Sequence, residues 1–275
     1  MVYKRMANPL VKSIMTELFL EYVDRVWCSA FVRVLIFNTI CCVIALLSNT
    51  NTLIDFAWYC NSLVIGATLF LSAEPKSRSW ILLAVLTIYT LRGAGHLLFT
   101  RVLKGANDKR YLDMARQRGF SPNIMLIWQF ILQAFLVMIP ALPLFFMFRG
   151  EKDTVFSYAG AAIAFVATIL THIADSQLRE FQLSNSERLE GTKKTFRGGL
   201  WAKSRHPNLF FEVLVWVGFA LAGVDGLISL IGFIGPLTLW AIMRFLTVPI
   251  TERAMAETRP DWSNILEETN MFLPF

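Results

Sequence analysis

The sequence predicts an all-α membrane protein, built as a bundle of about seven transmembrane helices. Of its 275 residues, 55% are hydrophobic and 17% are charged, whereas about 25% of the residues are charged in an average soluble domain. The apolar residues form unbroken blocks, and several blocks approach or exceed the roughly 20 residues that a helix needs to cross a bilayer. Such blocks, without alternation of apolar and polar residues, exclude a transmembrane β-barrel.

Seven apolar blocks are predicted to span the membrane. Only Asp225 and Gly226 separate the last two, which makes this boundary the weakest of the set. The blocks are residues 31–48, 53–72, 80–100, 124–148, 156–174, 209–224 and 227–250.

The first 26 residues are predicted to be an amphipathic segment at the membrane interface. Four charged residues interrupt this segment, and its apolar positions repeat at helical spacing. The same charges argue against a cleavable signal peptide. Residues 27–275 are predicted to form a single transmembrane domain.

Lys and Arg are distributed unequally between the two faces of the predicted bundle. The segments after spans three, five and seven carry 15 of them, and the opposite face carries eight. Because positive residues are retained on the cytoplasmic side, we expect the N-terminus outside and the C-terminus in the cytoplasm. The host membrane is then a bacterial inner membrane or the endoplasmic reticulum. No soluble basic domain suited to nucleic acid is present.

The four cysteines predict neither a metal site nor a disulfide. Cys28, Cys41, Cys42 and Cys60 lie in or beside apolar blocks, without a CxxC pair or a nearby histidine.

The candidate functional residues, which are polar or ionisable, are concentrated between residues 171 and 212. Asp175 and Arg179 are four residues apart and share a helix face, as an exposed ion pair would. Glu212 lies inside an apolar run, where an ionisable group costs a few kcal/mol unless it is paired or faces a polar cavity. Pro207 suits the first turn of a helix. Asn208 and Glu212 then lie one turn apart and face the same pocket.

The segment before this helix has features of an anion site. Gly198 and Gly199 permit close backbone approach, and the positive end of the helix dipole lies next to Arg205 and His206. The combination suits a phosphate or a ribose. A purely structural helix-entry motif is the alternative.

These residues carry a family resemblance. The run Gly-Gly-Leu-Trp-x-x-Ser-Arg-His-Pro-Asn-x-x-x-Glu, from Gly198 to Glu212, resembles the signature of the steroid 5-alpha-reductase family, and in detail its bacterial-type DUF1295 branch. Weaker matches follow the same order: Asp55-x-x-Trp58, Asp108-x-Arg110-Tyr111, Asp175-x-Gln177, and a tail from Glu252-Arg253 through Trp262 to Pro274.

The resemblance implies a membrane reductase that transfers a hydride from NADPH to a carbon–carbon double bond conjugated to a carbonyl. Its substrate would be a lipophilic small molecule, either steroid-like or an isoprenoid or fatty compound, taken from among the membrane lipids. The cofactor-binding half would cover about residues 171–275. By this analogy Asp175, Arg179, Asn208 and Glu212 contact the nicotinamide, its ribose or its phosphates. The candidates for the phosphates are Arg101, Arg110, Lys193, Lys194, Arg205 and Arg253.

The catalytic end of the family pattern is only partly present. Steroid reductases carry an adjacent Gln-Glu pair at the start of the second helix and a tyrosine in the third. Here the second helix begins Leu-Ile-Asp-Phe, so Asp55 takes the acidic role and Tyr89 the phenolic one. Arg92 and His96 follow on the same face of the third span. Because hydride addition leaves an enolate, the reaction needs a donor at the carbonyl oxygen, and Asp55, Tyr89 and Arg92 are the candidates. For Tyr89, the alternative to a catalytic role is packing alone. For His96, a contact between helices is favoured over a catalytic role.

Two other classes compete with this interpretation. Arg-His-Pro followed by an aromatic residue and an acidic C-terminal helix resembles the isoprenylcysteine and phospholipid methyltransferases, which use S-adenosylmethionine. Those enzymes typically have a glycine where Phe211 or Glu212 stands, and a Glu-Glu pair near Glu252. A non-catalytic scaffold would instead use Glu212, Arg92 and Arg244 only in buried pairs.

Overall fold

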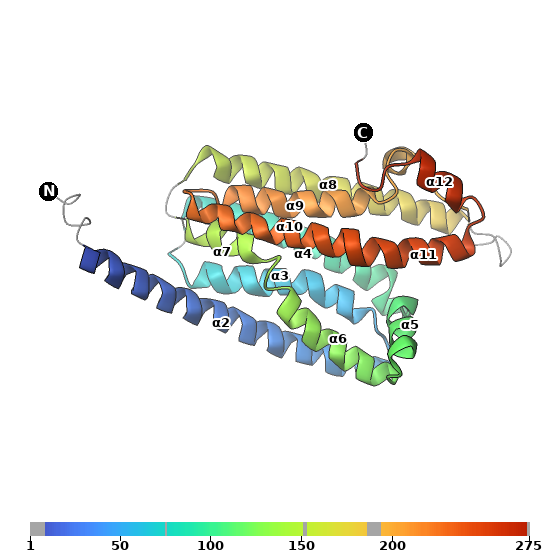
Figure 1. Ribbon diagram of the computed structural model, residues 1–275, viewed down its shortest axis with the longest axis horizontal. Helices are drawn as coiled ribbons and strands as arrows, with labels where there is room; N and C mark the ends of the chain where they lie inside the picture. The colour runs from blue at the N-terminus through green and yellow to red at the C-terminus, as the bar shows by residue number, and fades with distance from the viewer. Residues whose placement is uncertain (1–8, 75, 151–152, 186–193, 274–275) are drawn as a thin grey trace.

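The computed structural model describes residues 9–74, 76–150, 153–185 and 194–273, and this part of the chain is helical without any β-strand. The all-α class is therefore confirmed. Figure 1 shows the long helices side by side along one axis, with the short helices α5 and α12 at the same end. The α-helices are α2 (Pro9–Ser48), α3 (Leu53–Leu71), α4 (Ser77–Thr100), α5 (Lys109–Arg118), α6 (Pro122–Leu136), α7 (Leu142–Arg149), α8 (Val155–Ser184), α9 (Pro207–Ala222), α10 (Ile234–Ile242), α11 (Val248–Thr258) and α12 (Trp262–Glu268).

Five helices of the described chain are long and apolar enough to cross a membrane. They are Arg25–Ser48 within α2, then α3, Ser77–Lys104, α8 and the continuous helix Ile228–Thr258. A sixth span results if α5 and α6, which are bent by 106°, count as one. Helix α9 is apolar but shorter. These lengths and compositions fit a multi-pass membrane protein, while the count of seven spans and the orientation of the termini stay predictions.

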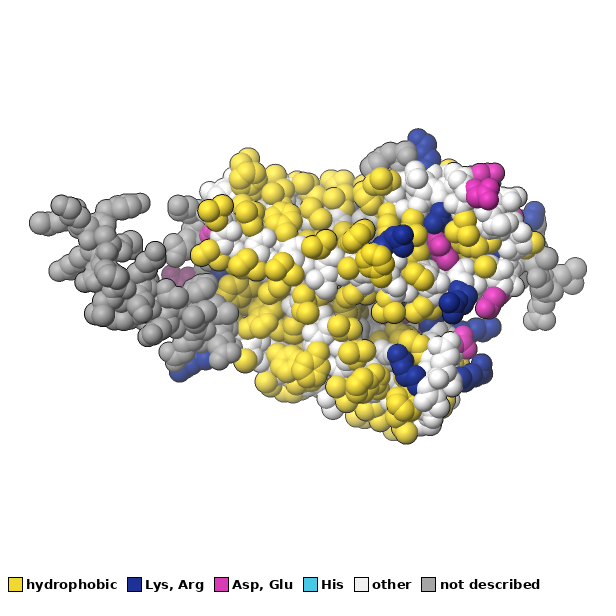
Figure 2. Space-filling view, in the orientation of Figure 1, with side chains coloured by type: hydrophobic (Ala, Val, Ile, Leu, Met, Phe, Trp, Pro, Cys, Tyr) yellow, Lys and Arg dark blue, Asp and Glu magenta, His cyan; other side chains and the backbone are white. Residues whose placement is uncertain are grey.

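The surface agrees with this interpretation. In Figure 2 apolar side chains cover the middle of the molecule, and charged side chains gather at the end that holds α5, α11 and α12. Large aliphatic and aromatic side chains are exposed along α2, α4, α6, α8 and the helix Ile228–Thr258. Contiguous apolar surface of this extent is typical of contact with lipid.

The predicted helix over residues 124–148 is wrong. Helix α6 ends at Leu136 and α7 begins at Leu142, with hydrogen-bonded turns between them. Pro140 and Pro143 lie at this junction, and proline lacks the N–H that a continuing helix would use. Hydropathy detects the apolar block but not the break within it.

Residues 9–26 of the predicted N-terminal segment do not form a separate element in the structure, and residues 1–8 lie outside the described residues. Helix α2 runs without a break from Pro9 to Ser48, so it joins the predicted interfacial segment to the first span. The chain between Leu10 and Ser48 contains neither glycine nor proline, so nothing in it ends a helix. Interfacial placement of residues 1–26 stays a prediction.

Buried amides connect the helices of the N-terminal half. Asn61 donates to Asn38 Oδ1 at 3.0 Å, and Asn38 donates to the carbonyl of Phe130 at 3.2 Å. Gln133 donates to the carbonyl of Ile54 at 2.9 Å. These bonds join α2, α3 and α6, and interhelical amide bonds of this kind hold helices together where water is absent.

Helices α8 and α9 approach each other closely through two glycines. A Cβ atom on Gly160 would lie 2.4 Å from the backbone nitrogen of Ala222 and 2.4 Å from the carbonyl oxygen of Gly218. A Cβ atom on Gly218 would lie 2.6 Å from the nitrogen of Ala164. Because the obstructing atoms are backbone atoms, no side-chain rotation relieves the clash. This close approach fixes α9 against α8.

We therefore expect Gly160→Ala to lower the free energy of unfolding by about 1–3 kcal/mol, the usual cost of overpacking. The measurement is thermal unfolding of the purified protein in detergent. Gly95→Ala is the matched control, because nothing lies within 4 Å of a Cβ atom at that position. Equal melting temperatures for the two variants would contradict the close contact of α8 and α9.

Candidate functional site

Glu212 is the centre of a buried polar network. It lies in the second turn of α9, where Pro207 occupies the first turn, and only 4% of its surface is exposed. Its Oε1 atom accepts a hydrogen bond from the hydroxyl of Tyr89. Its Oε2 atom accepts from the hydroxyl of Tyr59 at 3.2 Å and from Arg92 Nη2 at 3.3 Å. Three donors from α3 and α4 therefore surround one carboxylate of α9.

Arg92 connects this carboxylate to a second one. Its Nη1 atom lies 2.7 Å from Asp175 Oδ2, and its Nη2 atom lies 3.3 Å from Glu212 Oε2. The guanidinium carbon also lies 5.5 Å from the centroid of the Tyr59 ring. Only 9% of the Arg92 side chain is exposed. Asp175 thus pairs with an arginine of another helix, and no ion pair with Arg179 is recorded for the described residues.

Asn208 completes the network at the first turn of α9. Its Nδ2 atom donates to Asp175 Oδ1 at 3.0 Å. Asn208 and Glu212 share a helix face, as the one-turn spacing predicts. Asn208 contacts Asp175, which pairs with Arg92, and Glu212 contacts Arg92 itself. The network therefore joins α3, α4, α8 and α9.

The phenol of Tyr89 is held from two sides. Trp216 Nε1 donates to the Tyr89 oxygen at 3.1 Å, while the Tyr89 hydroxyl donates to Glu212. The rings of Trp216 and Phe219 pack edge-on against the Tyr89 ring at centroid distances of 6.0 Å. Tyr89 is completely buried. Packing thus fixes the position of the phenol oxygen, and only the direction of its O–H bond can change.

Two buried polar atoms of this network have no hydrogen-bond partner. They are Asn208 Oδ1 and Arg92 Nε. Because a carboxylate only accepts hydrogen bonds, the NH₂ group of Asn208 must face Asp175, and its carbonyl oxygen is left unpaired. Leaving a buried polar atom unpaired costs about 1–3 kcal/mol. One free acceptor and one free donor at the centre of the network fit a polar ligand.

A family model described as "Protein of unknown function (DUF1295)" matches residues 41–268. The chain belongs to the DUF1295 family. No curated protein and no solved structure matches it.

In this DUF1295 protein Asp55 lies in a different cluster from Tyr89. Tyr111 donates to Asp55 Oδ1 at 2.7 Å, and Arg110 Nη2 lies 3.1 Å from Asp55 Oδ2. Arg110 also contacts Asp108 at 2.7 Å, and Asp108 accepts the backbone N–H of Arg110 as the N-cap of α5. Burial raises the pKa of Asp108, but the hydrogen bonds and charge of Arg110 outweigh burial and hold this pKa below its ordinary value. Asp55 and Arg110 are thus engaged in holding α5 against α3.

Arg205 is also engaged with other protein groups. Its Nε atom lies 2.8 Å from Glu252 Oε1, and its Nη1 atom donates to the carbonyls of Leu266 and Thr269. His206 Nε2 lies 3.0 Å from the same Glu252 oxygen. These contacts fix the start of α9 to α11 and to the segment after α12.

The remaining predicted cations lie near the solvent. Arg179, Lys194 and Arg253 are exposed, and Arg101 contacts Asp108 at 3.0 Å. Lys193 lies outside the described residues. Arg179 and Arg253 come from the helices that flank the start of α9.

The glycines before α9 serve a close approach. Gly199 has a φ of +56°, and a Cβ atom there would meet the Gln177 side chain at 2.5 Å. Gln177 Oε1 accepts the N–H of Leu200 at 3.0 Å, and Trp201 Nε1 donates to the carbonyl of Ala174 at 2.9 Å. The family motif thus packs directly on α8 beside Asp175.

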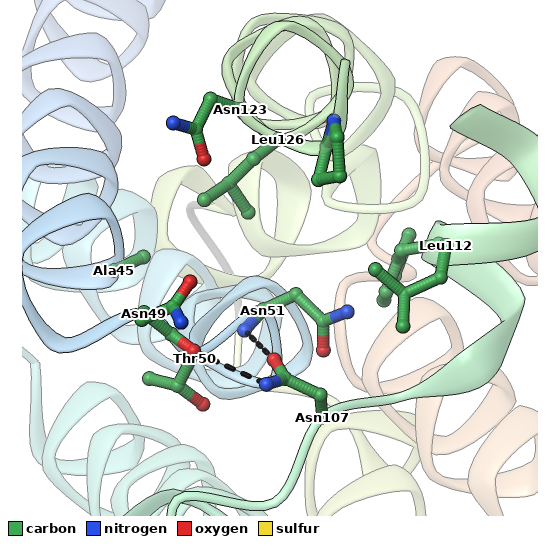
Figure 3. Close-up of a pocket in the computed structure, with 10 residues that line it drawn as sticks. Ala45, Asn49, Thr50, Asn51, Asn107, Leu112, Asn123 and Leu126 are labelled. Atoms are coloured by element: carbon green, nitrogen blue, oxygen red, sulfur yellow. Dashed lines mark hydrogen bonds between the residues drawn. The ribbon is translucent and has the colours of Figure 1, made fainter. Parts of the chain in front are cut away.

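A polar pocket of about 60 Å³ lies between the α2–α3 turn and the α5–α6 region. Figure 3 shows Asn107 reaching towards Asn51 and the backbone of Asn49. Asn51 N donates to Asn107 Oδ1 at 2.8 Å, and Asn107 Nδ2 donates to the Asn49 carbonyl at 3.1 Å. Because these polar groups bond to one another, the best explanation of the pocket is structural: it lies where the α2–α3 turn is held against the segment before α5.

Sequence reasoning missed Tyr59 and Trp216. Tyr59 lies one turn after Asp55 on α3, and Trp216 lies one turn after Glu212 on α9, so both follow a predicted site residue at helical spacing. Aromatic residues are common in such helices, and spacing alone does not distinguish a bonding hydroxyl or indole from packing.

We expect Arg92→Gln to lower the free energy of unfolding by about 3–5 kcal/mol, because it leaves the buried carboxylate of Glu212 and the partly buried carboxylate of Asp175 without their cation. Thermal unfolding in detergent measures the effect. Arg116→Gln is the control, since that exposed arginine pairs only with exposed Asp113 at 3.4 Å and should change stability by less than about 0.5 kcal/mol. If Arg92→Gln melts like the control, the ion pairs of Arg92 do not hold the bundle together.

Proposed function

We propose that this protein is a membrane-bound reductase that transfers a hydride from NADPH to a carbon–carbon double bond conjugated to a carbonyl in a lipophilic substrate. The observation that carries the proposal is the convergence of Tyr89, Arg92, Asp175, Asn208 and Glu212. Five residues chosen from the sequence for one reaction come from three helices into one hydrogen-bonded network. Such a convergence of buried ionisable groups is typical of a functional site.

The free atoms of the network suit the nicotinamide end of the cofactor. Asn208 Oδ1 is a buried acceptor without a partner, and it suits the N–H group of a carboxamide. Arg92 Nε is a buried donor without a partner, and it suits a carboxamide or ribose oxygen. When bound, NADPH supplies the hydride. Asp175 holds both Asn208 and Arg92 in the orientations that leave these atoms free.

The exposed cations suit the phosphates of the same cofactor. Arg179, Lys194 and Arg253 are all exposed: Arg179 lies one turn after Asp175 on α8, Arg253 follows Glu252 on α11, and Lys194 precedes the segment that leads to α9. Arg110 and Arg205 are less suited, because their guanidinium groups already contact Asp55, Asp108, Glu252 and backbone carbonyls. We therefore assign binding of the NADPH phosphates to Arg179, Lys194 and Arg253.

Tyr89 is the proposed donor to the carbonyl oxygen of the substrate. Trp216 Nε1 fixes the phenol oxygen, so only its O–H bond must turn from Glu212 towards the substrate. Arg92 and Tyr59 continue to satisfy Glu212 when the Tyr89 proton turns away. Asp55 belongs to the Arg110 cluster, and in this proposal it positions α5 and does not act as the donor.

The methyltransferase alternative is tested by the choice of ligand. NADPH, NADH and S-adenosylmethionine are added separately to the purified protein, and thermal shifts are compared. A ligand at a hundredfold excess over its Kd stabilises the folded state by about 2.7 kcal/mol. We expect the largest shift with NADPH. A shift with S-adenosylmethionine alone would replace the reductase proposal.

We expect Asn208→Ala to weaken NADPH binding by about two- to tenfold, which corresponds to the loss of one neutral hydrogen bond. Isothermal titration in detergent measures the Kd. Asn123→Ala is the matched control, because Asn123 is exposed at the start of α6. Unchanged affinity in a folded Asn208→Ala protein would remove Asn208 from the cofactor site.

We expect Tyr89→Phe to keep the NADPH affinity and to reduce turnover by about 10²–10³-fold, as when one oxyanion donor is lost. The assay follows NADPH consumption with steroid, isoprenoid and fatty enones. Tyr158→Phe is the control, because Tyr158 is exposed and its hydroxyl lies 3.5 Å from Asp153. Parental turnover by Tyr89→Phe would place the carbonyl donor elsewhere, with Arg92 and His96 the next candidates on the same helix.

A further inference from the structure

A largely apolar groove lies outside the polar network. It has a volume of about 440 Å³, within the range of small-molecule sites. Its walls come from α9, α10 and the segment after α12. The lining residues are Phe210, Val213, Trp240, Asn270, Met271, Phe272 and Leu273.

The groove and the network lie on opposite faces of α9. At 3.6 residues per turn, Phe210 points about 180° and Val213 about 120° away from the midpoint between Asn208 and Glu212. A molecule in the groove therefore does not contact the network. A ligand of this groove is distinct from the proposed cofactor and substrate.

The C-terminal wall of the groove is built in place by hydrogen bonds. Ser204 Oγ donates to the carbonyl of Phe272 at 2.9 Å. The N–H groups of Arg205 and His206 donate to the carbonyls of Asn270 and Met271 at 2.8 and 3.1 Å. A wall held in this way is already formed before a ligand binds.

Arg244 lies one turn after Trp240, which lines the groove. It belongs to the continuous apolar helix Ile228–Thr258, and it forms no ion pair with an acidic side chain of residues 25–74, 76–150, 153–185 and 194–273. Its guanidinium lies 5.5 Å from the centroid of the Phe245 ring, and that ring packs edge-on against Trp240 at 5.8 Å. An arginine within an apolar span is costly unless an anion or water compensates it.

The helix is altered at this arginine. Residues Met243–Thr247 form a π-helical turn between α10 and α11. Such turns are rare and are frequent at functional sites. Phe245, within this turn, contacts both the Arg244 guanidinium and the Trp240 ring, so it connects the positive charge to the wall of the groove.

The depth of Arg244 fits the level of a lipid phosphate. It lies sixteen residues after Ile228, which corresponds to about 25 Å along the helix, and the hydrocarbon core is about 30 Å thick. A long arginine side chain extends a few Å further towards the headgroups. The apolar groove begins at Trp240, one turn before Arg244 in the same apolar helix.

We propose that this groove binds one anionic phospholipid of the surrounding bilayer, with an acyl chain between α9, α10 and the C-terminal segment and the phosphate at Arg244. The chain accounts for the apolar lining, and the phosphate supplies the anion that Arg244 lacks. A free phosphate would not use the groove, and in a zwitterionic lipid the headgroup cation offsets the charge of the phosphate.

Native mass spectrometry of the delipidated protein in detergent tests the proposal. Phosphatidylglycerol and phosphatidylcholine with the same acyl chains are added in equal amounts, and the bound fractions are compared. We expect about a fivefold preference for phosphatidylglycerol, the factor that one basic side chain near an anionic headgroup contributes. Glycerol phosphate, which has no acyl chain, should not compete. Equal binding of the two lipids, or full competition by glycerol phosphate, would overturn the proposal.

Four variants separate the two parts of the site. Arg244→Gln should remove the preference, whereas Arg244→Lys should retain it and Arg116→Gln should not change it. Val213→Trp fills the groove and should reduce binding of both lipids while the charge remains. Retained preference in Arg244→Gln, or parental binding in Val213→Trp, would overturn the assignment. The experiment contains neither NADPH nor an enone, so its outcome is independent of the proposed reaction.

Discussion

The requirement that ionisable side chains within an apolar bundle be paired governs the centre of this structure. Arg92 of α4 satisfies Asp175 of α8 and Glu212 of α9 together, and Tyr59 and Tyr89 supply the remaining donors. Removing Arg92 leaves two carboxylates without their cation in surroundings that solvate them poorly. Helices α3, α4, α8 and α9 are therefore held in one register by this set of contacts. Packing follows the same register, because Gly160 and Gly218 allow α8 and α9 to approach closely enough for Asp175 to reach Asn208.

Local spacing on the sequence predicts some of these contacts but not others. Asn208 and Glu212 face one site because they follow Pro207 at one-turn spacing, and this geometry is contained in the sequence. The partner of Asp175 is not, because spacing offers Arg179 whereas the structure uses Arg92. An exposed pair on one helix is worth about 0.3–0.5 kcal/mol, and two buried charges from different helices outweigh it once the bundle forms. Tertiary pairing of this kind requires knowledge of which helices meet.

The apolar blocks predict where helices lie but not where they bend. The block from 124 to 148 has the composition of one span, yet it is divided at Pro140 and Pro143 into α6 and α7. At the N-terminus the prediction fails in the opposite way. The charged residues indicate a boundary near residue 26, but α2 continues through it. Backbone chemistry determines both outcomes, since proline removes a donor while charged side chains leave the helix intact. Asp55 illustrates a third case, because its partners Arg110 and Tyr111 come from a short helix whose position depends on the loops around it.

The first turn of α9 connects the polar network to the apolar groove. Its Asn208 belongs to the polar network, while the residues just before it, Arg205 and His206, bind Glu252 and the carbonyls of the C-terminal segment. The other side of that segment forms the wall of the apolar groove. Displacing the segment would therefore move the start of α9, and with it the orientation of the Asn208 amide. The groove and the network share no atom, but they share this turn, and a coupling between the two sites requires only that a ligand in the groove favour one position of the segment over another.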